Sequence, residues 1–282
     1  MRKIISVVLT ILFLLTFSVA STASEVDRNQ EVIFEAKEIK DMNLIKKRMK
    51  QGITDDKNLK IKSHIYGDLI VEKNGKKYEL VKKSISTTSQ KLKEVKTRTG
   101  NKADLVATTI VEYGLKPVND VKQNTFTIQG VGSSFENNYD SYPTWVEQYM
   151  TTYYTYKDPV EINSVSGTSL QITKNDTKLV RLDSQIVLQN IKSQIKYKGD
   201  LYSDIDCTNF VTSTGFYPLV YEEKFSYVSS DQFYPHTVSP NYFVHLEPNV
   251  VGGIAMAQSW GTVVRGTSSQ TLYTEFIKDS SF

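Results

Sequence analysis

The stretch LIVEKNGKKYEL, residues 69–80, predicts a β-hairpin with Asn74 and Gly75 at its turn. Asn-Gly suits a type I′ turn, because both of its central residues must adopt positive φ. A two-residue loop then pairs Glu72 with Lys77 across the two strands. Because side chains alternate along a strand, the same register places four apolar residues on one face: Leu69, Val71, Tyr78 and Leu80.

Outward from this hairpin, strand-like runs follow one another at short spacing, with turn residues between them. They cover residues 91–97 and 103–113 around Thr99-Gly100-Asn101, 145–156, 168–174 and 178–189 around Asn175-Asp176, 191–197, 216–228, 250–264, and 270–278 after a loop at 265–269. Many short strands without a recurring amphipathic helix predict an all-β protein. We expect an antiparallel β-sandwich of immunoglobulin-like form.

Three pieces of the C-terminal half carry a resemblance. They are Thr151-Thr152-Tyr153-Tyr154-Thr155, Ser213-Thr214-Gly215-Phe216, and the ending from Val251-Gly252-Gly253 through residues 265–269 to Leu272. In these pieces the chain resembles a group of uncharacterised secreted β-rich proteins of Gram-positive bacteria. The resemblance implies secretion and β structure, and it implies no particular chemistry.

One short helix is expected before the strands, over residues 41–51. Asp41 is a suitable N-cap, and Gly52 stands where a C′ glycine ends a helix. The apolar residues Met42, Ile45 and Met49 share one helical face, and Val32, Ala36 and Ile39 extend the same stripe upstream. The alternative for this charged stretch is a mobile leader.

The N-terminus is typical of a secretory signal peptide. Arg2 and Lys3 precede an uncharged apolar stretch at residues 4–19, and Ser21-Thr22-Ala23 fits a small-x-small cleavage site. An uncleaved transmembrane helix is the alternative, but the stretch is near the minimum length for spanning. No later apolar run is long enough to cross a bilayer, so no transmembrane anchor is expected and the protein is predicted to be extracellular.

Removing residues 1–23 leaves about 259 residues, enough for one large β domain or two smaller ones. We expect a charged, partly helical segment over residues 24–57 and a β-rich region over 58–282. The β-rich region has a candidate subdivision near residue 131, where the charge balance changes.

Basic residues concentrate early in the chain. Residues 37–102 hold nineteen Lys or Arg against eight Asp or Glu, whereas residues 131–282 hold ten against sixteen. On a strand, Lys60 and Lys62 should share a face, as should Lys91 and Lys93. Such a surface suits anionic polymers of a cell envelope, whereas sparse aromatic interleaving argues against nucleic acid. The alternative is that these lysines only solubilise an exposed face.

Two groups of residues could bind a metal ion. His236, His245 and Glu247 are of the types that ligate zinc, although no HExxH-like spacing accompanies them. Asp200, Asp204 and Asp206 could supply oxygen ligands to Ca²⁺, but the glycine-bearing loop of an EF-hand is missing. An ordinary Pro-bounded loop and a solvated acidic loop are the expected explanations, so no metal, cofactor or binding residue is assigned.

The sequence contains no motif that indicates nucleophilic catalysis. No GxSxG elbow and no phosphate-binding glycine loop occurs, and Cys207 lies in no known catalytic signature. As the only cysteine it forms no internal disulfide, and we expect it to be buried. The adjacent acids Glu222 and Glu223 should point to opposite faces of a strand, too far apart to flank one bond.

The tyrosines gather late in the chain, in the stretch that includes Tyr139, Tyr142, Tyr149, Tyr153 and Tyr154. Exposed, they would stack on sugar rings or another partner; buried, as we expect for most of them, they form the core. The hypothesis that fits best is a non-catalytic binding or structural protein outside the cell, associated with the envelope, with carbohydrate or protein as partner. The alternatives are a secreted β-pore-forming toxin, suggested by the Ser/Thr-rich stretch 169–189, and a secreted hydrolase.

Overall fold

The computed structural model describes residues 31–67, 70–97, 99–118, 143–215, 217–239, 242–247 and 253–279. The predicted signal peptide and its cleavage site, Leu69, position 131, Tyr139 and Tyr142 lie outside these residues. The chain from Val32 onward forms one compact unit. Among the described residues, no helix is long and apolar enough to cross a lipid bilayer.

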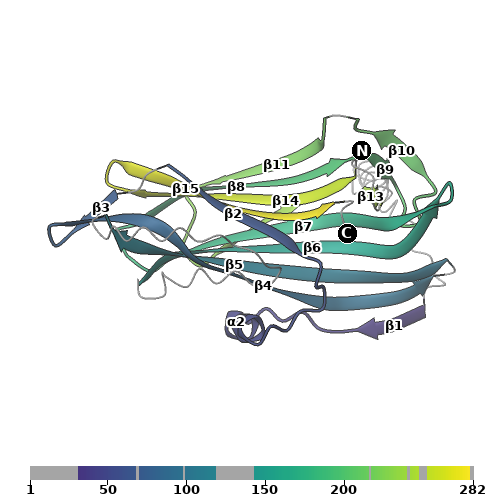
Figure 1. Cartoon of the computed structure of the whole chain (residues 1–282), viewed down its shortest axis with the longest axis horizontal. Coiled ribbons are helices and arrows are strands. Elements are labelled where there is room, and N and C mark those ends of the chain that lie inside the picture. The colour runs from purple at the N-terminus through teal and green to yellow at the C-terminus, as the bar shows by residue number, and fades with distance from the viewer. Residues whose placement is uncertain are drawn as a thin grey trace, which may run out of the picture. The chain divides into compact units, whose positions relative to one another are not determined.

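The unit contains two antiparallel β-sheets and one short helix, so the all-β prediction is confirmed (Figure 1). The ten-stranded sheet has the order β1-β4-β5-β6-β7-β13-β9-β10, with β3 beside β4 and β12 beside β7. The five-stranded sheet has the order β11-β8-β14-β15-β2. The strands of the first sheet are β1 (Glu31–Glu35), β3 (Ile70–Lys73), β4 (Lys76–Thr97), β5 (Gly100–Pro117), β6 (Thr144–Ile162), β7 (Val165–Arg181), β9 (Asp200–Tyr202), β10 (Phe210–Ser213), β12 (Phe233–Thr237) and β13 (Phe243–Leu246). Those of the second are β2 (Lys60–Tyr66), β8 (Val187–Lys198), β11 (Leu219–Ser226), β14 (Ile254–Arg265) and β15 (Ser268–Asp279).

The two sheets pack face to face, and their core has three layers along the strands. One apolar cluster joins Leu105 and Ile172 of the first sheet to Ile195 of the second. The other joins Leu179 to Ile191 and their neighbours. Between these clusters lies a buried polar layer, in which hydrogen bonds connect the two sheets; it contains Gln148, Asn175, Thr177, Ser193 and Ser259.

The predicted hairpin is confirmed in its turn and in its register. Asn74 and Gly75 have φ of 54° and 70°, as a type I′ turn requires. The pairs Val71 with Tyr78 and Glu72 with Lys77 form as expected. Val71 and Tyr78 contribute to the second apolar cluster, so a local turn fixes which face of β3 and β4 enters the core.

Replacing Gly75 with valine should lower the free energy of unfolding by about 1 kcal/mol or more, because a β-branched residue is strained at positive φ. Lys77→Val is the matched control, since it adds the same side chain to an ordinary strand position of the same hairpin. Urea denaturation of both variants measures the difference. Equal stability of the two would show that the strained turn is not formed.

The short helix is confirmed, but its upstream extension is wrong. Helix α2 (Met42–Lys50) begins after Asp41, whose carboxylate accepts a hydrogen bond from the backbone N–H of Asn43. It ends before Gly52, which has φ of 65°. The stripe predicted to continue through Val32, Ala36 and Ile39 is not helical: Val32 lies in β1, and the Ala36 N–H pairs with a carbonyl of β4. Pairing with a sheet edge outweighs the helical spacing there.

The turn predicted at Asn175-Asp176 is also wrong. Strand β7 runs straight through both residues, which pair with Thr152 and Thr151 of β6. The Asn175 amide is fully buried in the polar layer, where it bonds Ser193 and Ser259. These tertiary hydrogen bonds satisfy the group that would otherwise favour a turn. The stretch 169–189 is therefore no hairpin, because its first part lies in β7 and its last residues lie in β8 of the other sheet.

Candidate functional site

An aromatic row crosses the outer face of the five-stranded sheet. The strand register aligns one residue of each strand: His64, Tyr273, Trp260, Lys192 and Lys224. Because neighbouring strands lie about 4.8 Å apart, this line of five residues is about 19 Å long, and its aromatic part, from His64 to Trp260, is about 10 Å long. We call His64, Tyr273, Trp260 and the adjacent Tyr66 the aromatic row.

The rings of the aromatic row contact one another in sequence. The His64 and Tyr273 ring centroids lie 6.0 Å apart with an interplanar angle of 15°, and the Trp260 and Tyr273 centroids are 5.1 Å apart. The Tyr66 ring lies 6.0 Å from that of Tyr273. The Lys192 ammonium lies 5.0 Å from the Trp260 ring centroid, a cation–π contact. The result is a row of contacting rings beside a cation, in which the central ring, Tyr273, is itself buried.

Strand alternation explains why these rings face outward. In β14, Ala257 and Ser259 point into the core and are fully buried, so Gln258 and Trp260 point away from it. In β2, Ser63 is bonded to the core residue Tyr113, which leaves His64 on the outer face. The aromatic row therefore follows from the same period that builds the core.

A polar row runs beside the aromatic row, two residues along each strand. It consists of Lys62, Glu275, Gln258, Gln194 and Glu222. The Gln258 amide donates to the Tyr273 hydroxyl and to the Glu275 carboxylate, both at 2.5 Å, and the Tyr273 hydroxyl also donates to Glu275. Burial and this carboxylate raise the pKa of Tyr273, so its hydroxyl stays protonated. The central tyrosine is thus fixed in position.

At the other end of the polar row, Glu222 is surrounded by donors. It lies 2.8 Å from the Lys192 ammonium and 3.0 Å from that of Lys224, and it accepts from the Gln194 amide. These hydrogen bonds lower the pKa of Glu222 to about 2, so it is ionised at any ordinary pH. Lys192 therefore bridges the acid and the face of Trp260.

The five-stranded sheet leaves this face accessible, as far as the described residues go. Tyr66 is 52% exposed, the Lys62 side chain 60% and that of Lys224 69%, while Trp260 is half-buried. Exposed clusters of aromatic residues rimmed by polar groups mark binding surfaces. The row combines ring faces, amides and charges, which are the groups that recognise a sugar chain or a similarly flat ligand.

The opposite outer face, on the ten-stranded sheet, is covered in part, over β4 and β6. Residues 36–55, which include α2, cross it and are called the strap (Figure 1). The strap contributes Lys46 to an ion pair with Glu147 at 3.1 Å, and Glu38 accepts from the Tyr153 hydroxyl at 2.9 Å. Ile45 is the one buried residue of α2, so polar contacts contribute much of the interaction between the strap and the sheet.

The tyrosine cluster predicted from the sequence is mostly internal, as expected. Tyr149 lies beneath the strap and Tyr154 lies in the core between the sheets, and both are buried, whereas Tyr153 and Tyr156 are half-buried. The accessible aromatic surface is instead built from His64 and Tyr66 of β2 and Trp260 of β14, with the buried Tyr273 of β15 between them. Sequence reasoning looked for a local run of aromatic residues and therefore missed a row assembled across strands.

The histidine and aspartate groups do not form metal sites. His236 pairs with Asn175 of β7 and His245 with Ser169, which places them about 20 Å apart along the strand. His236 bonds Ser193, while Nδ1 of His245 lies 3.4 Å from Glu247. No group of three metal-binding side chains occurs among the described residues.

The three aspartates have structural partners instead. Asp204 accepts hydrogen bonds from the backbone N–H groups of Thr208 and Asn209 and so closes its own loop. Asp206 pairs with the buried Lys157 and accepts from Thr99 at 2.7 Å. These contacts lower the pKa of Asp206. Asp200 lies in β9 opposite Ser213. Loop closure and charge pairing therefore account for Asp204 and Asp206.

Cys207 is buried and free, as expected. Its thiol donates to Ser169 at 3.3 Å, and burial raises its pKa to about 11. A thiol that stays protonated at neutral pH is a poor nucleophile.

The prediction that Glu222 and Glu223 point to opposite faces of their strand is also confirmed. Glu222 pairs with Gln194 on the outer face, and Glu223 pairs with Ser193 on the inner face.

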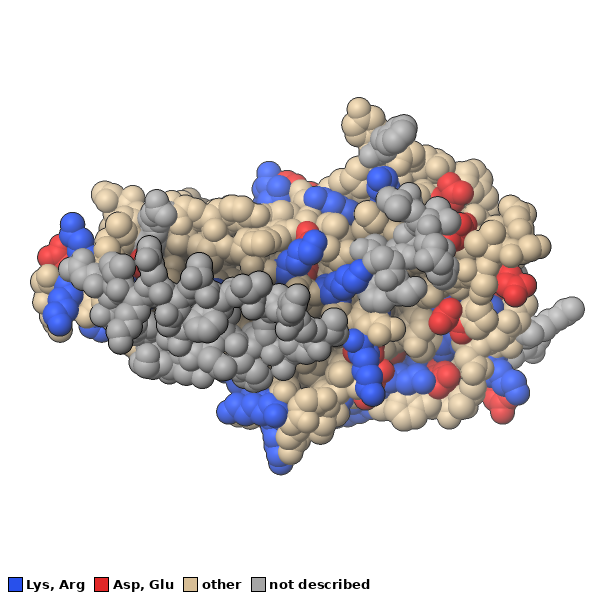
Figure 2. Space-filling view, in the orientation of Figure 1, with Lys and Arg blue, Asp and Glu red and all other residues tan. Residues whose placement is uncertain are grey.

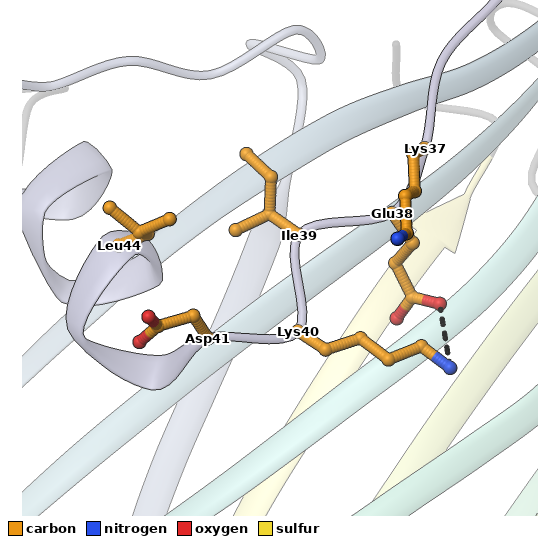
Figure 3. A pocket seen from close by; sticks show the side chains of 6 residues that line it. All are labelled: Lys37, Glu38, Ile39, Lys40, Asp41 and Leu44. Carbon is orange, nitrogen blue, oxygen red and sulfur yellow. Dashed lines mark ion pairs between the residues drawn. The ribbon is translucent and has the colours of Figure 1, made fainter.

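A hollow beside the start of α2 is lined by Lys37, Glu38, Ile39, Lys40, Asp41 and Leu44, all from one short segment (Figure 3). Figure 3 shows Ile39 and Leu44 on one side of it and the Glu38–Lys40 ion pair on the other. Among the described residues, none from another element lines it, so the hollow lacks the groups converging from several elements that a ligand site has.

The lysines of the basic region do not form one patch. Lys60 and Lys62 share the outer face of β2, as predicted. Lys91 and Lys93 do not share a face, because a bulge at Leu92 pairs Lys91 with the core residue Leu105 and Lys93 with Asp104. In Figure 2 the lysines and arginines stand in separate groups on the visible face, with acidic residues among them.

Comparison with known proteins identifies no relative: no protein-family model, no curated protein and no solved structure matches the chain.

Proposed function

We propose that this protein is a non-catalytic binding protein that acts outside the cell and holds a glycan chain on the aromatic row. The observation that carries the proposal is the alignment of Trp260 and His64 on either side of Tyr273 across neighbouring strands. Among the described residues, the rings of Tyr66, His64 and Trp260 reach the surface, whereas Tyr273 is only 6% exposed and packs between them. A sugar ring has an apolar C–H face that packs on an aromatic ring, and hydroxyls around its rim that need hydrogen-bond partners.

The dimensions and chemistry of the site suit an extended ligand. The aromatic row spans two strand intervals, about 10 Å, and Lys192 and Lys224 extend the strip to about 19 Å. This strip accommodates several sugar rings in line, and the polar row runs along one side of it. Gln194, Gln258 and Lys192 are held in place by Glu222 and Glu275, so little side-chain entropy is lost on binding. An open, flat strip of this kind favours a polymer over a small molecule, which needs an enclosing pocket.

The polar row also argues for binding without cleavage. Its two acids, Glu222 and Glu275, are separated by three strand intervals, or about 14 Å. Glycoside hydrolysis uses two carboxyl groups about 5–9.5 Å apart. Glu222 is moreover ionised down to about pH 2, which leaves it no proton to donate. The hydrolase hypothesis therefore has no support from this face.

A secreted β-pore-forming toxin remains the second hypothesis, but it has lost the observation on which it rested. That observation was the Ser/Thr-rich stretch 169–189 as one alternating hairpin, whereas its first part lies in β7, which is paired on both sides in the interior of its sheet. Three expectations stay predictions: the immunoglobulin-like form of the sandwich, export, and association with the cell wall.

The basic region, residues 37–102, supports association with the cell wall. Five of its lysines make no ion pair with another described residue and could attract anionic wall polymers: Lys76, Lys77, Lys82, Lys93 and Lys96.

Replacing Trp260 with alanine should weaken glycan binding at least tenfold, because the largest ring surface of the row is lost. The chain has only two tryptophans, and Trp145 is buried, so Trp145→Phe leaves Trp260 as the single fluorescent reporter. Saturable changes in its emission with oligosaccharides from peptidoglycan, chitin and cellulose would measure the affinity of the form that keeps Trp260, whereas Trp260→Ala, which lacks this reporter, is compared by isothermal titration calorimetry. Insoluble forms of the same polymers allow a pull-down.

Tyr217→Ala is the matched control, since Tyr217 is 85% exposed and lies on the connection before β11. It should bind like the unmodified protein. Working at 1 M salt shortens the Debye length to about 3 Å and removes attraction by the basic region. Binding that survives Trp260→Ala, or an absence of binding to every polymer at both salt concentrations, would refute the proposal.

A further inference from the structure

Lysines gather at one end of the strip that carries the aromatic row, on β8 and β11. Strand alternation places Lys192, Lys196 and Lys198 on the outer face of β8, because the residues that alternate with them, 191, 193, 195 and 197, are fully buried. Lys224 of β11 stands directly beside Lys192. We call these four residues the lysine cluster. The fold gathers it from residues 131–282, in which acids outnumber bases.

One acid accompanies the lysine cluster on the outer face of its two strands. Glu222 lies 2.8 Å from the Lys192 ammonium and 3.0 Å from that of Lys224, and one carboxylate balances only one of these two charges. Glu223, the other acid of β11, lies on the inner face, and β8 contains no acid. The cluster therefore keeps an excess of three positive charges on these two strands.

Two members of the cluster, Lys196 and Lys198, make no ion pair with another described residue. Lys196 is half-buried, and burial lowers its pKa; Glu275 raises that pKa, whereas the neighbouring Lys192 lowers it. A bound anion would favour the charged amine and relieve the repulsion between the two lysines. The cluster therefore suits a negatively charged group that the described part of the chain does not supply.

We propose that the glycan on the aromatic row is acidic, and that its carboxylate or phosphate groups lie on the lysine cluster. This inference rests on the proposed function. The Lys192 ammonium lies 5.0 Å from the Trp260 ring centroid, so a charged substituent of a sugar on that ring reaches Lys192. Lys224 stands on the next strand, about 4.8 Å further on. At the β2 end of the strip Lys62 is already matched by Glu275 at 3.8 Å, so the charge of the ligand is bound at the β8–β11 end.

Isothermal titration calorimetry measures this preference with two acidic hexasaccharides and their uncharged counterparts. A hyaluronan hexasaccharide carries carboxylates, which methyl esterification neutralises. A phosphorylated mannose hexasaccharide carries phosphates, which dephosphorylation removes. At about 0.15 M salt an acidic form should bind at least about tenfold more tightly than its counterpart, and the ratio should fall toward one at 1 M salt. The pair that shows the preference identifies the anionic group.

The double variant Lys196→Gln with Lys224→Gln removes two charges of the cluster and leaves Lys192 paired with Glu222 beside Trp260. Its affinity for the acidic hexasaccharide should fall at least about fivefold, whereas its affinity for the uncharged counterpart should not change. Lys76→Gln with Lys77→Gln is the matched control, since it makes the same change of net charge on an exposed hairpin. It should bind like the unmodified protein. Circular dichroism checks that both variants are folded.

The outcomes separate this inference from the proposed function. Equal affinity for acidic and uncharged forms, with both lost in Trp260→Ala, would overturn the inference and leave the glycan site standing. An equal loss in the two double variants would also overturn it, because the attraction would then come from the net charge of the whole chain. If no hexasaccharide binds, or if Trp260→Ala binds the acidic forms unchanged, the proposed function fails and this inference fails with it.

Discussion

Replacing Asp56 with alanine is expected to destabilise the protein by about 3–5 kcal/mol. Asp56 lies where the strap re-enters the sandwich, and its carboxylate is 2.9 Å from the Lys278 ammonium. The two side chains are only 11% and 10% exposed. The Tyr154 hydroxyl donates to the same carboxylate at 2.5 Å. Removing Asp56 leaves a buried cation and a buried hydroxyl without their main partner, which costs far more than losing a surface pair.

The pKa of Lys278 gives this prediction a pH dependence. Burial lowers that pKa in the folded protein, although Asp56 partly offsets the effect. Without Asp56 the pKa should fall further. The unfolded chain then binds the proton more tightly than the folded one, so the stability of Asp56→Ala should rise as the pH increases toward the ordinary lysine pKa. The variant should accordingly recover part of its stability at alkaline pH.

Two controls define the measurement, which is urea denaturation at several pH values. Glu79→Ala removes an exposed partner of Lys116, 3.6 Å away, and should cost less than about 1 kcal/mol. The double variant Asp56→Ala with Lys278→Met removes both charges and should be more stable than Asp56→Ala alone. A loss for Asp56→Ala no larger than that for Glu79→Ala would contradict a buried pair at this position.

The features that could be predicted from the sequence are those set by neighbouring residues. The Asn74-Gly75 turn is determined by the φ values that its two residues tolerate, and it determines the register of β3 and β4. The cap of α2 depends on Asp41 and on the N–H group two residues later. In both cases the interacting groups are close in the chain, so the pattern contains the whole interaction.

The features that could not be predicted depend on partners far away in the chain. β1 is a strand because an edge of β4 is free to pair with it, although its spacing also suits a helix. The bulge at Leu92, which separates Lys91 from Lys93, appears only in the pairing of β4 with β5. Spacing within one strand cannot reveal either of them.

The candidate site shows the same limit. Alternation within β14 predicts that Gln258 and Trp260 share a face, but it cannot tell which residues of other strands stand beside them. The pairing of β2 with β15 brings together residues about 200 positions apart, as in the hydrogen bond from Gln270 to the Gly67 carbonyl. Which face meets solvent is decided by the core, and the aromatic row exists only once β2, β15 and β14 are in register.

The polar layer of the core supplies the second large expected effect: Asn175→Val should destabilise the protein by about 2–4 kcal/mol. Asn175 accepts from the Thr152 hydroxyl and donates to the hydroxyls of Ser193 and Ser259, all at 3.0 Å. Valine leaves buried hydroxyls of both sheets with fewer partners, and of the two β7 side chains that bond the other sheet it leaves only that of Thr177, which contacts Ser259.

Strand propensity predicts the opposite sign, which makes this substitution informative. Valine is a better strand former than asparagine by up to about 1 kcal/mol, so β7 considered alone should gain stability. Asn190→Val is the matched control, because Asn190 lies on the outer face of β8, away from the polar layer. That variant should be unchanged or slightly more stable. Urea denaturation measures the stability of Asn175→Val and Asn190→Val. The same measurement on Ser259→Ala and on the double variant Asn175→Val with Ser259→Ala gives the coupling energy between the two sheets. If Asn175→Val is more stable than the unmodified protein, or if its loss of stability simply adds to that of Ser259→Ala in the double variant, apolar packing alone holds the sheets together. If the double variant loses much less stability than the sum of the two single variants, the polar layer is the contact that fixes how the sheets meet.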